Sequence, residues 1–357
     1  DRLLFYFFHI VPEQGPKQYP QVRLLSRAPA KADRTAAQAP QPAPGELLVQ
    51  VAAAGVDPAR WKALLGWLPF GGQEMPLVTG FDGAGTVVAL GEGVTGIAIG
   101  DRVGFMSSIA LGRGGSFAEF AVCLADHAVR LPDGVGFAEA ATAPVAGISA
   151  REALVSQGGI AAGETVFING GAGGTGLWGV QIARAVGARV AATAGPANQS
   201  VLAAFGVECA IDYRNEDVAA RLLEWAPGGV DVVLDTVGQG SLPDPASLLR
   251  KSGRYLAIET MLPDEAVPDP ARMAERGVTA LRVSASWERL GLHLSALYQT
   301  MAEGRMRALP FAQLPAACAG EALERVRSGH VSGKLVLSFA NENDWAAPPA
   351  PTKEPTA

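Results

Sequence analysis

The stretch Asn169–Thr193, NGGAGGTGLWGVQIARAVGARVAAT, decides the fold. It holds seven glycines, although glycine weakens both helices and strands. The apolar run Glu164–Ile168 before it predicts a short buried strand, and Leu177–Val186 has apolar residues at helical spacing. A strand, a glycine-rich turn and a helix are the layout of a phosphate-binding loop. The stretch therefore predicts the start of a nucleotide-binding domain.

Three glycines of this loop, Gly171, Gly173 and Gly176, satisfy the pattern G-x-G-x-x-G. Glycine permits the tight turn, lets backbone N–H groups approach a pyrophosphate, and lets the helix pack closely on the strand. A glycine-rich turn without a ligand is the alternative. The chain around the loop favours the ligand, because helical stretches alternate there with the short apolar runs ETVFI, ARVAAT, CAID, VDVVLD and RYLAI. This alternation predicts a doubly wound parallel sheet.

The chain on both sides of this region has a different pattern. From Glu46 it shows short strands bounded by Gly, Pro or Asp, which predict a β-rich, barrel-like module, and this character returns near Ala308. We predict an α/β protein with a β-rich domain (residues 1–144 and 306–340) and an inserted nucleotide-binding domain (145–305). The Pro/Ala-rich tail, 341–357, is expected to be disordered. Before Glu46 we expect one strand in the first ten residues, one near Gln21–Leu25, and otherwise loop.

The composition of the chain limits the classes of partner that it can bind. The 357 residues exceed the usual size of a single core, and the net charge is -6 with a pI near 5.4. An acidic chain does not favour nucleic acid or an anionic membrane, and no apolar run has the length of a membrane span. The three cysteines are scattered, which argues against a disulfide framework and a Cys-rich zinc site. We expect a cytoplasmic protein.

The residues after the second strand of the parallel sheet decide between NAD and NADP. An NAD site has an Asp or Glu there for the ribose 2′-hydroxyl. The segment Ala191–Ser200, AATAGPANQS, has no acid, and its Asn198, Gln199 and Ser200 can donate hydrogen bonds. The next basic residue is Arg214, beside Tyr213. These features favour NADPH over NADH.

Several motifs in order resemble the medium-chain dehydrogenase/reductase superfamily, in its zinc-free quinone oxidoreductase and enoyl reductase branch. The resemblance covers most of residues 45–339. It rests on PGELLVQVAAAGVDPARWKALLG, PLVTGFDGAGTVVALGEGVTGIAIGDRV, GGSFAEFAV, TAPVAGISAREAL, the glycine loop and SGHVSGKLVLSF. It implies a GroES-like catalytic domain, a Rossmann cofactor domain and hydride transfer to or from a nicotinamide.

The resemblance also allows a comparison with the zinc ligands of zinc-dependent relatives. Zinc-dependent relatives carry a Cys after the A-x-G-V turn and a His-Glu pair in a later G-H-E motif. Asp57 and the pair Phe81-Asp82 stand at these places, and the four histidines show no ligand spacing. We therefore predict neither a catalytic nor a structural zinc. The segment Gly80–Gly85, with Asp82, is interpreted as structural.

Relatives often read N-P-x-D-W-K where this chain reads DPARWK, with Asp57 in place of Asn and Arg60 in place of the acid. The resemblance makes Lys62 a candidate to stabilise the oxyanion that hydride addition creates and to donate a proton. A solvated surface lysine is the alternative. Asp57 is expected to pair with Arg60 or Lys62, or else to repel an enolate.

Two further positions follow from the resemblance. Ser149 matches a Ser/Thr near the nicotinamide, and Lys334 a position near the cofactor. Their alternatives are a helix N-cap and a surface charge at a strand end. The candidate catalytic residues are Lys62, Asp57 and Ser149. The candidate cofactor-binding residues are Gly171, Ala172, Gly173, Gly174, Thr175, Gly176, Thr193, Asn198, Ser200, Tyr213, Val237, Gly238, Ile258 and Lys334.

The sequence thus favours an NADPH-dependent reductase of quinones or of C=C bonds conjugated to a carbonyl. One alternative is a zinc-free dehydrogenase of alcohols or ketones. Another is a nucleotide-binding protein with little activity, because Asp57 and Arg60 depart from the usual motif. The expected partner is a small electrophilic substrate. The resemblance also suggests a homodimer that pairs an edge strand at Val278–Val283.

Overall fold

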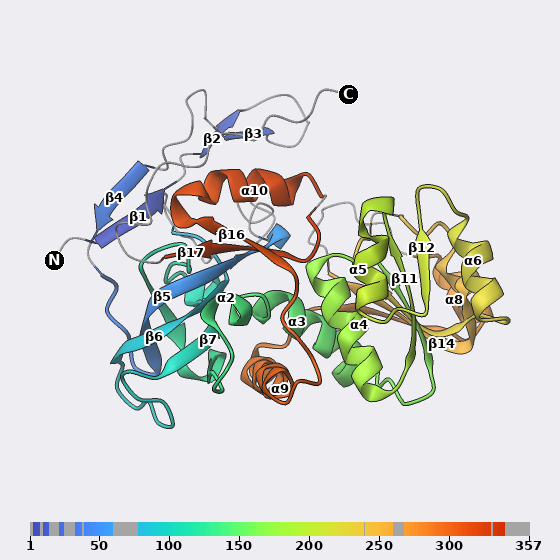
Figure 1. The fold of residues 1–357 in the computed structure, drawn as a ribbon, viewed down its shortest axis with the longest axis horizontal. Helices are drawn as coiled ribbons and strands as arrows, with labels where there is room; N and C mark the ends of the chain where they lie inside the picture. Colours follow the sequence, from blue (N-terminus) through green and yellow to red (C-terminus); the bar gives the residue numbers. More distant parts are fainter. Residues whose placement is uncertain are drawn as a thin grey trace.

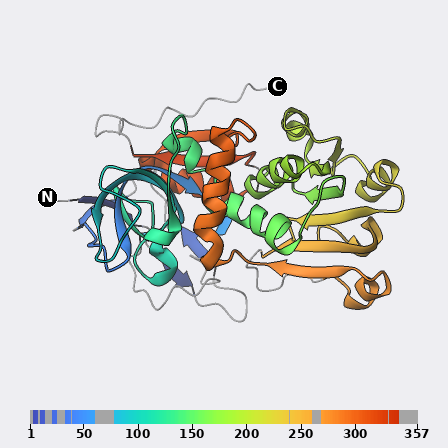
Figure 2. The same cartoon turned by 90° about the horizontal axis from the view of Figure 1, so that it is seen from below.

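The computed structural model describes residues 3–7, 10–13, 21–24, 33–37, 39–59, 78–238, 240–259, 268–329 and 331–339. Two sheets lie side by side, with the β-rich sheet at the left of Figure 1 and the parallel sheet at the right. Helices α3 (Pro144–Arg151) and α9 (Leu290–Ala302) lie between them, as the perpendicular view in Figure 2 also shows. Among the described residues, no helix is both long and apolar enough to cross a bilayer.

The parallel sheet has six strands, and every neighbouring pair in it is parallel. Its strand order, counted along the chain, is 3-2-1-4-5-6, which is the order of dinucleotide-binding folds. In space the strands run β12 (Cys209–Asp212), β11 (Arg189–Ala194), β10 (Thr165–Asn169), β13 (Val230–Asp235), β14 (Leu249–Ile258) and β15 (Thr279–Val283). The order reverses between β10 and β13, and ligands bind at the carboxyl ends of the strands there.

Short helices connect these strands. They are α4 (Gly174–Val186), α5 (Gln199–Ala204), α6 (Val218–Trp225), α7 (Pro245–Leu248) and α8 (Pro270–Glu275). Helix α4 ends at Gly187, whose φ of +94° is the left-handed conformation that glycine adopts at little cost. The chain can therefore turn directly from α4 into β11.

The β-rich sheet joins two distant parts of the chain. Its order is β16 (Phe311–Pro315), β17 (Lys334–Ser338), β5 (Glu46–Val56), β6 (Asp82–Leu90), β7 (Arg102–Met106) and β9 (Ala128–Arg130), and β8 (Phe120–Leu124) also pairs with β5. Helices α2 (Phe137–Ala140) and α10 (Ala319–Arg327) pack on it. Because β17 pairs with β5, the residues that begin β17 lie beside those that end β5.

The remaining elements are short. The N-terminal strands form two separate pairs, β1 (Leu3–Phe7) with β4 (Asp33–Ala37) and β2 (Ile10–Glu13) with β3 (Gln21–Leu24). A π-helical turn, η3 (Glu152–Gln157), continues α3. The 3-10 turns are η1 (Ser108–Leu111), η2 (Ala125–His127), η4 (Pro196–Asn198), η5 (Trp287–Arg289) and η6 (Ala316–Cys318).

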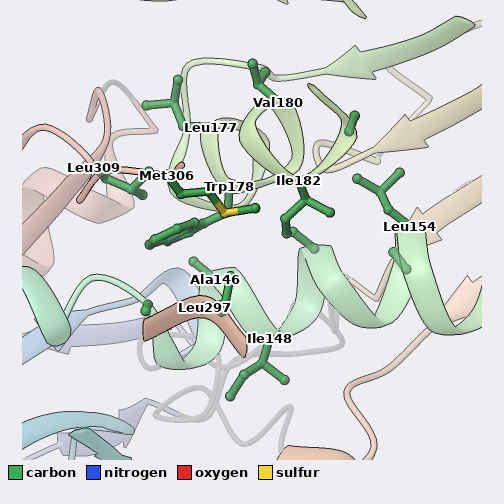
Figure 3. Close-up of a cluster of buried hydrophobic side chains, with 14 of the residues drawn as sticks. Ala146, Ile148, Leu154, Leu177, Trp178, Val180, Ile182, Leu297, Met306 and Leu309 are labelled. Atoms are coloured by element: carbon green, nitrogen blue, oxygen red, sulfur yellow. The ribbon is translucent and has the colours of Figure 1, made fainter. Parts of the chain in front are cut away.

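The core between the two sheets is centred on Trp178 of α4, which is fully buried. Figure 3 shows its ring beside Ala146 of α3 and Leu297 of α9. Its indole nitrogen donates a hydrogen bond to the Thr142 carbonyl at 3.0 Å. A Cβ on Gly147 would lie 2.6 Å from Leu297, so glycine lets α3 approach α9 closely. This packing fixes the nucleotide-binding sheet against the β-rich sheet.

The predicted fold class is confirmed: a β-rich part is joined to a doubly wound parallel sheet. The predicted stretches of the parallel sheet all form strands, and ELLVQVAAAGV is strand β5. The strands β2 and β4 were not expected and fall largely within the stretch predicted as loop. The boundaries at 144/145 and 305/306 stay a prediction, because α9 packs on both α3 and β9. The predicted disordered tail lies outside the described residues.

Candidate functional site

The glycine loop connects β10 to α4, and its glycines have different roles. Gly170 has φ +80°, which allows the turn out of the strand. A Cβ on Gly176 would lie 2.2 Å from the Gly170 carbonyl oxygen, and a Cβ on Gly171 would lie 2.6 Å from Ala192 Cβ. Both positions exclude a side chain, because the loop's own backbone fills the space at Gly176 and strand β11 fills it at Gly171. They make the turn tight and bring α4 close to β10.

Gly173 is different, because the fold leaves room for a side chain there. It caps the start of α4 with φ −77° and ψ 171°, a conformation open to any residue. A Cβ there would have its nearest neighbour, the Gly170 carbonyl oxygen, at 3.5 Å. No acidic residue stands in the first turn of α4, so the positive end of the helix is not neutralised locally. The space at Gly173 therefore fits a phosphate group held by backbone N–H groups.

A buried polar network holds the strand ends around this loop. Thr193 accepts a hydrogen bond from the Gly170 N–H and donates one to Asn169 Oδ1, both at 2.9 Å. Asn169 Nδ2 donates to Asp235 Oδ1 at 2.9 Å, and the Tyr255 hydroxyl donates to Asp235 Oδ2 at 2.6 Å. The network joins β10, β11, β13 and β14. The Thr193 hydroxyl is thus engaged in positioning the loop, as is its carbonyl oxygen, which accepts a hydrogen bond from the Gly171 N–H at 2.8 Å.

Several predicted cofactor-binding residues lie at the same end of the sheet. Asp235 accepts hydrogen bonds from the N–H groups of Val237 and Gly238, both at 3.0 Å, which fixes the turn after β13. The Val237 side chain is 41% exposed, so it is available to a ligand. Ile258 ends β14, two strands from the glycine loop. The carboxyl ends of β10, β13 and β14 therefore bring these residues to the switch point of the sheet.

The end of β11 carries hydrogen-bond donors and a cation. Asn198 lies in η4, and Ser200 is exposed in the first turn of α5. A Cβ on Gly195 would lie 3.7 Å from Arg214 Nε and 3.8 Å from the Tyr213 ring, so both side chains reach this point. The Arg214 guanidinium also lies over the Tyr213 ring, 5.8 Å from the ring centroid. The structure therefore brings together the residues that were predicted to read a 2′-phosphate.

A buried cluster of two acids and one lysine lies on the other side of the glycine loop. Asp57 follows β5, Asp82 begins β6 and Lys334 begins β17, and each is at most 4% exposed. The Lys334 ammonium pairs with Asp57 Oδ1 and, at 2.8 Å, with Asp82 Oδ2. Asp82 Oδ1 also accepts a hydrogen bond from the Val145 N–H at the start of α3, at 2.8 Å. We call these three side chains the acid–lysine cluster.

The backbone connects this cluster to the glycine loop. The Gly333 N–H donates to the Ala172 carbonyl oxygen at 2.9 Å, and Gly333 forms a parallel bridge with Gly173. A Cβ on Gly174 would lie 3.7 Å from Lys334 Cδ. Lys334 therefore lies beside the predicted phosphate site, but its charge is directed to the two aspartates.

These positions correct three interpretations. Lys334 is not a surface charge at a strand end, because its side chain is 3% exposed. Ser149 is not a helix N-cap, since it lies inside α3. Asp57 was expected to pair with Arg60 or Lys62; it pairs with Lys334, and Arg60 and Lys62 lie outside the described residues.

Burial controls the charge of the cluster. Burial raises the pKa of the Asp82 carboxyl to about 8, and the neighbouring Asp57 carboxylate adds to the rise, while Lys334 opposes it. Burial also lowers the pKa of Lys334, but the attraction of the two carboxylates outweighs this and leaves it above its ordinary value. Lys334 is thus held charged, and Asp82 binds a proton at neutral pH.

This shift predicts a pH dependence of stability. The pKa of Asp82 is raised on folding from 3.8 to about 8, so the folded state binds more protons than the unfolded state between these values. The stabilising contribution is fully present below pH 4 and is lost as the pH rises through 8. We expect urea denaturation to show this decline for the wild type, and a flatter profile for Asp82→Asn. An unchanged profile in the variant would contradict the assignment to Asp82.

Comparisons with known proteins agree with this geometry. A family model described as "Alcohol dehydrogenase GroES-like domain" matches residues 43–133, and one described as "Zinc-binding dehydrogenase" matches residues 205–337. The chain belongs to the medium-chain dehydrogenase/reductase superfamily. Members of this superfamily bind a nicotinamide cofactor. The open space at Gly173 and the donors at the end of β11 fit such a cofactor.

The relatives place the chain in the quinone oxidoreductase and enoyl reductase-like branch of the superfamily. It is similar to the solved structures of the CurK enoyl reductase (TM-score 0.75, 27% identity, 86% of this chain and 94% of that chain) and of a mycobacterial quinone oxidoreductase (TM-score 0.75, 28% identity, 94% and 99%). It is 31% identical over 330 residues to a component of the phenolphthiocerol/phthiocerol polyketide synthase of Mycobacterium tuberculosis. That match covers 88% of this chain and 14% of the much longer synthase polypeptide.

The residues do not fit the zinc ion that one family description implies. Phe81 offers no donor atom, and the carboxylates of Asp57 and Asp82 already share the Lys334 ammonium. In the described part of the chain, no group of three or more His, Cys, Asp or Glu side chains is arranged to hold a metal ion. At this place in the fold the positive charge comes from a lysine.

Proposed function

We propose that the protein is an NADPH-dependent reductase of quinones or of C=C bonds conjugated to a carbonyl. The observation that carries the proposal is that the glycine loop adjoins the acid–lysine cluster. Gly333 donates to Ala172 in the loop, and the next residue, Lys334, holds Asp57 and Asp82. A nucleotide whose pyrophosphate is bound at the loop would thus lie next to groups that hold protons. The similarity to an enoyl reductase and a quinone oxidoreductase supports this reaction type.

The protein's own groups have separate tasks in this proposal. The loop from Gly171 to Gly176 binds the pyrophosphate through its backbone N–H groups. Val237, Gly238 and Ile258, which lie at the ends of β13 and β14, are candidate contacts of the cofactor, and Ser149 of α3 remains a candidate contact of the nicotinamide. Bound NADPH supplies a hydride to an electron-poor carbon. The negative charge that develops on the substrate oxygen then needs a donor or a cation, for which Lys62 remains the candidate.

The experiment is a panel of quinones and enones, with loss of the reduced nicotinamide absorbance as the readout. Turnover of NADPH with any member supports the reductase. Tight NADPH binding without turnover on the panel, but with oxidation of an alcohol by NADP, would replace it with a dehydrogenase. Binding without any turnover would leave a nucleotide-binding protein.

Arg214 is expected to determine the preference for NADPH. Arg214→Ala removes the cation beside Gly195, so we expect NADPH to bind about tenfold more weakly while NADH affinity stays the same, because only NADPH has the 2′-phosphate. Fluorescence titration with both nucleotides measures this. Arg189→Ala is the matched control, since Arg189 is an exposed arginine at the opposite end of β11. Equal losses for both nucleotides would show that Arg214 does not read the phosphate.

The predicted dimer also remains a proposal. Strand β15 is the edge strand of the parallel sheet, as pairing of two copies through it requires.

A further inference from the structure

The acid–lysine cluster contains more acidic groups than basic groups. It contains two carboxyl groups and one ammonium, and all three side chains are at least 96% buried. Three ionised groups would leave one net negative charge inside the protein. An uncompensated buried charge is costly, so groups in this position take up a proton instead.

The surroundings of the cluster supply no second cation in the described part of the chain. The charges acting on Asp82 are those of Asp57 and Lys334. From α3, the N–H of Val145 faces Asp82, and this is a neutral donor at a helix N-terminus. From α9, Tyr298 faces the cluster, and burial raises the pKa of its hydroxyl well above the ordinary value, so it stays neutral. From β5, the residue next to Asp82 is Gly55, which has no side chain and contributes only backbone.

The hydrogen bonds of the carboxyl groups indicate where the extra proton lies. Asp57 Oδ2 is buried and accepts no hydrogen bond from a described donor, and Asp82 Oδ2 has only its ion pair with Lys334. The two carboxyl groups are neighbours, because both pair with the same Lys334 ammonium. A proton bound to one carboxyl group could donate a hydrogen bond to the unpaired oxygen of the other. Two adjacent carboxyl groups that share one proton are a known arrangement for acid catalysis.

We propose that Asp57 and Asp82 share one stored proton beside the Lys334 ammonium, and that Asp57 donates this proton to the reduced substrate. This rests on the proposed reductase function. Addition of hydride to the β-carbon of an enone forms a C–H bond and moves the π-electron pair toward the carbonyl, giving an enolate. The enolate takes the proton from the Asp57 carboxyl, the O–H bond breaks, and its electron pair stays on the carboxylate. A proton from solvent then restores the pair.

The position of Asp57 suits this role. It is the first residue after β5, and its buried Oδ2 accepts no hydrogen bond from a described donor. Lys334 and Asp82 are positioning residues: they set the charge and proton of Asp57 and do not themselves meet the substrate. The arrangement differs from the one expected from the sequence, in which Lys62 supplied both the charge and the proton.

The proton store is tested in the free protein by infrared spectroscopy. We expect the C=O stretching band of a protonated, buried carboxylic acid at pH 6, and its loss as the pH rises through 8. Either Asp57→Asn or Asp82→Asn should abolish the band, because one carboxylate and one ammonium need no extra proton. Glu152→Gln is the matched control. Glu152 is equally buried, but hydrogen bonds from Arg289 and others outweigh burial and hold its pKa near 2. Absence of the band in the wild type would overturn the proton store.

The donation step is tested by single-turnover kinetics. Loss of a general acid typically slows a reaction about a hundredfold or more. We therefore expect the Asp57→Asn variant to convert substrate about a hundredfold more slowly than the wild type. The wild-type rate should fall above pH 8, and the Asp57→Asn rate should not. A wild-type rate in the variant would overturn donation by Asp57. If the wild type reduces no acceptor, the proposed function fails, and the infrared result still decides whether the proton is stored.

Discussion

Replacing Lys334 by methionine is expected to lower the free energy of unfolding by about 3–5 kcal/mol at pH 8. The substitution leaves Asp57 and Asp82 buried without their cation, and removal of one partner from a buried ion pair typically costs this much. The loss should be smaller at pH 5, because burial raises the pKa of the Asp82 carboxyl, which can bind a proton there. Urea denaturation at the two pH values measures the difference.

Two further variants make this result specific. Arg305→Met breaks an exposed ion pair with Glu303, and its expected cost is below about 1 kcal/mol. The triple variant Lys334→Met, Asp57→Asn, Asp82→Asn removes all three charges, so it should recover most of the stability lost in Lys334→Met. A loss of less than about 1 kcal/mol in Lys334→Met itself would mean that the cluster is solvated and not an internal ion pair.

Gly173→Ala should weaken NADPH binding about a hundredfold and leave the free energy of unfolding almost unchanged. The backbone at Gly173 suits alanine, and the added Cβ meets only the Gly170 oxygen at 3.5 Å. The same Cβ enters the space assigned to phosphate. Losing about two charge-assisted hydrogen bonds, at about 1.5 kcal/mol each, corresponds to a factor of about one hundred. Fluorescence titration and urea denaturation measure the two quantities.

Gly176→Ala is the matched comparison. Its Cβ would lie 2.2 Å from the Gly170 carbonyl oxygen, which is backbone and cannot move aside cheaply. We expect this variant to lose stability as well as NADPH affinity. If Gly173→Ala binds NADPH as tightly as the wild type, the phosphate does not lie at Gly173.

The strand–loop–helix unit was predictable because its signals are local. The apolar run before the loop, the spacing of Gly171, Gly173 and Gly176, and the helical period after it lie within about thirty residues. The absence of an acid after β11 and the presence of Arg214 were also readable, and the fold places them together. The N-terminal strands β2 and β4 were missed because their stretch has little apolar periodicity.

The acid–lysine cluster was not predictable from spacing. Lys334 and Asp57 are 277 residues apart, and only the pairing of β17 with β5 brings them together. The resemblance pointed to each residue separately, Lys334 near the cofactor and Asp57 at a catalytic position. Asp82 appeared structural because it stands among glycines. The sequence did offer one signal. Asp57 and Asp82 stand at two positions where zinc-dependent relatives hold a metal, so a cation from elsewhere in the chain was needed to balance them.

The most direct test of the account is a fluorescence titration of the wild-type protein with NADPH and NADH. The account predicts saturable binding of both nucleotides at one site, with NADPH bound about tenfold more tightly, because Arg214 and its neighbours add a contact to the 2′-phosphate. Binding of neither nucleotide would contradict the assignment of the glycine loop as a cofactor site, and with it the proposed reductase.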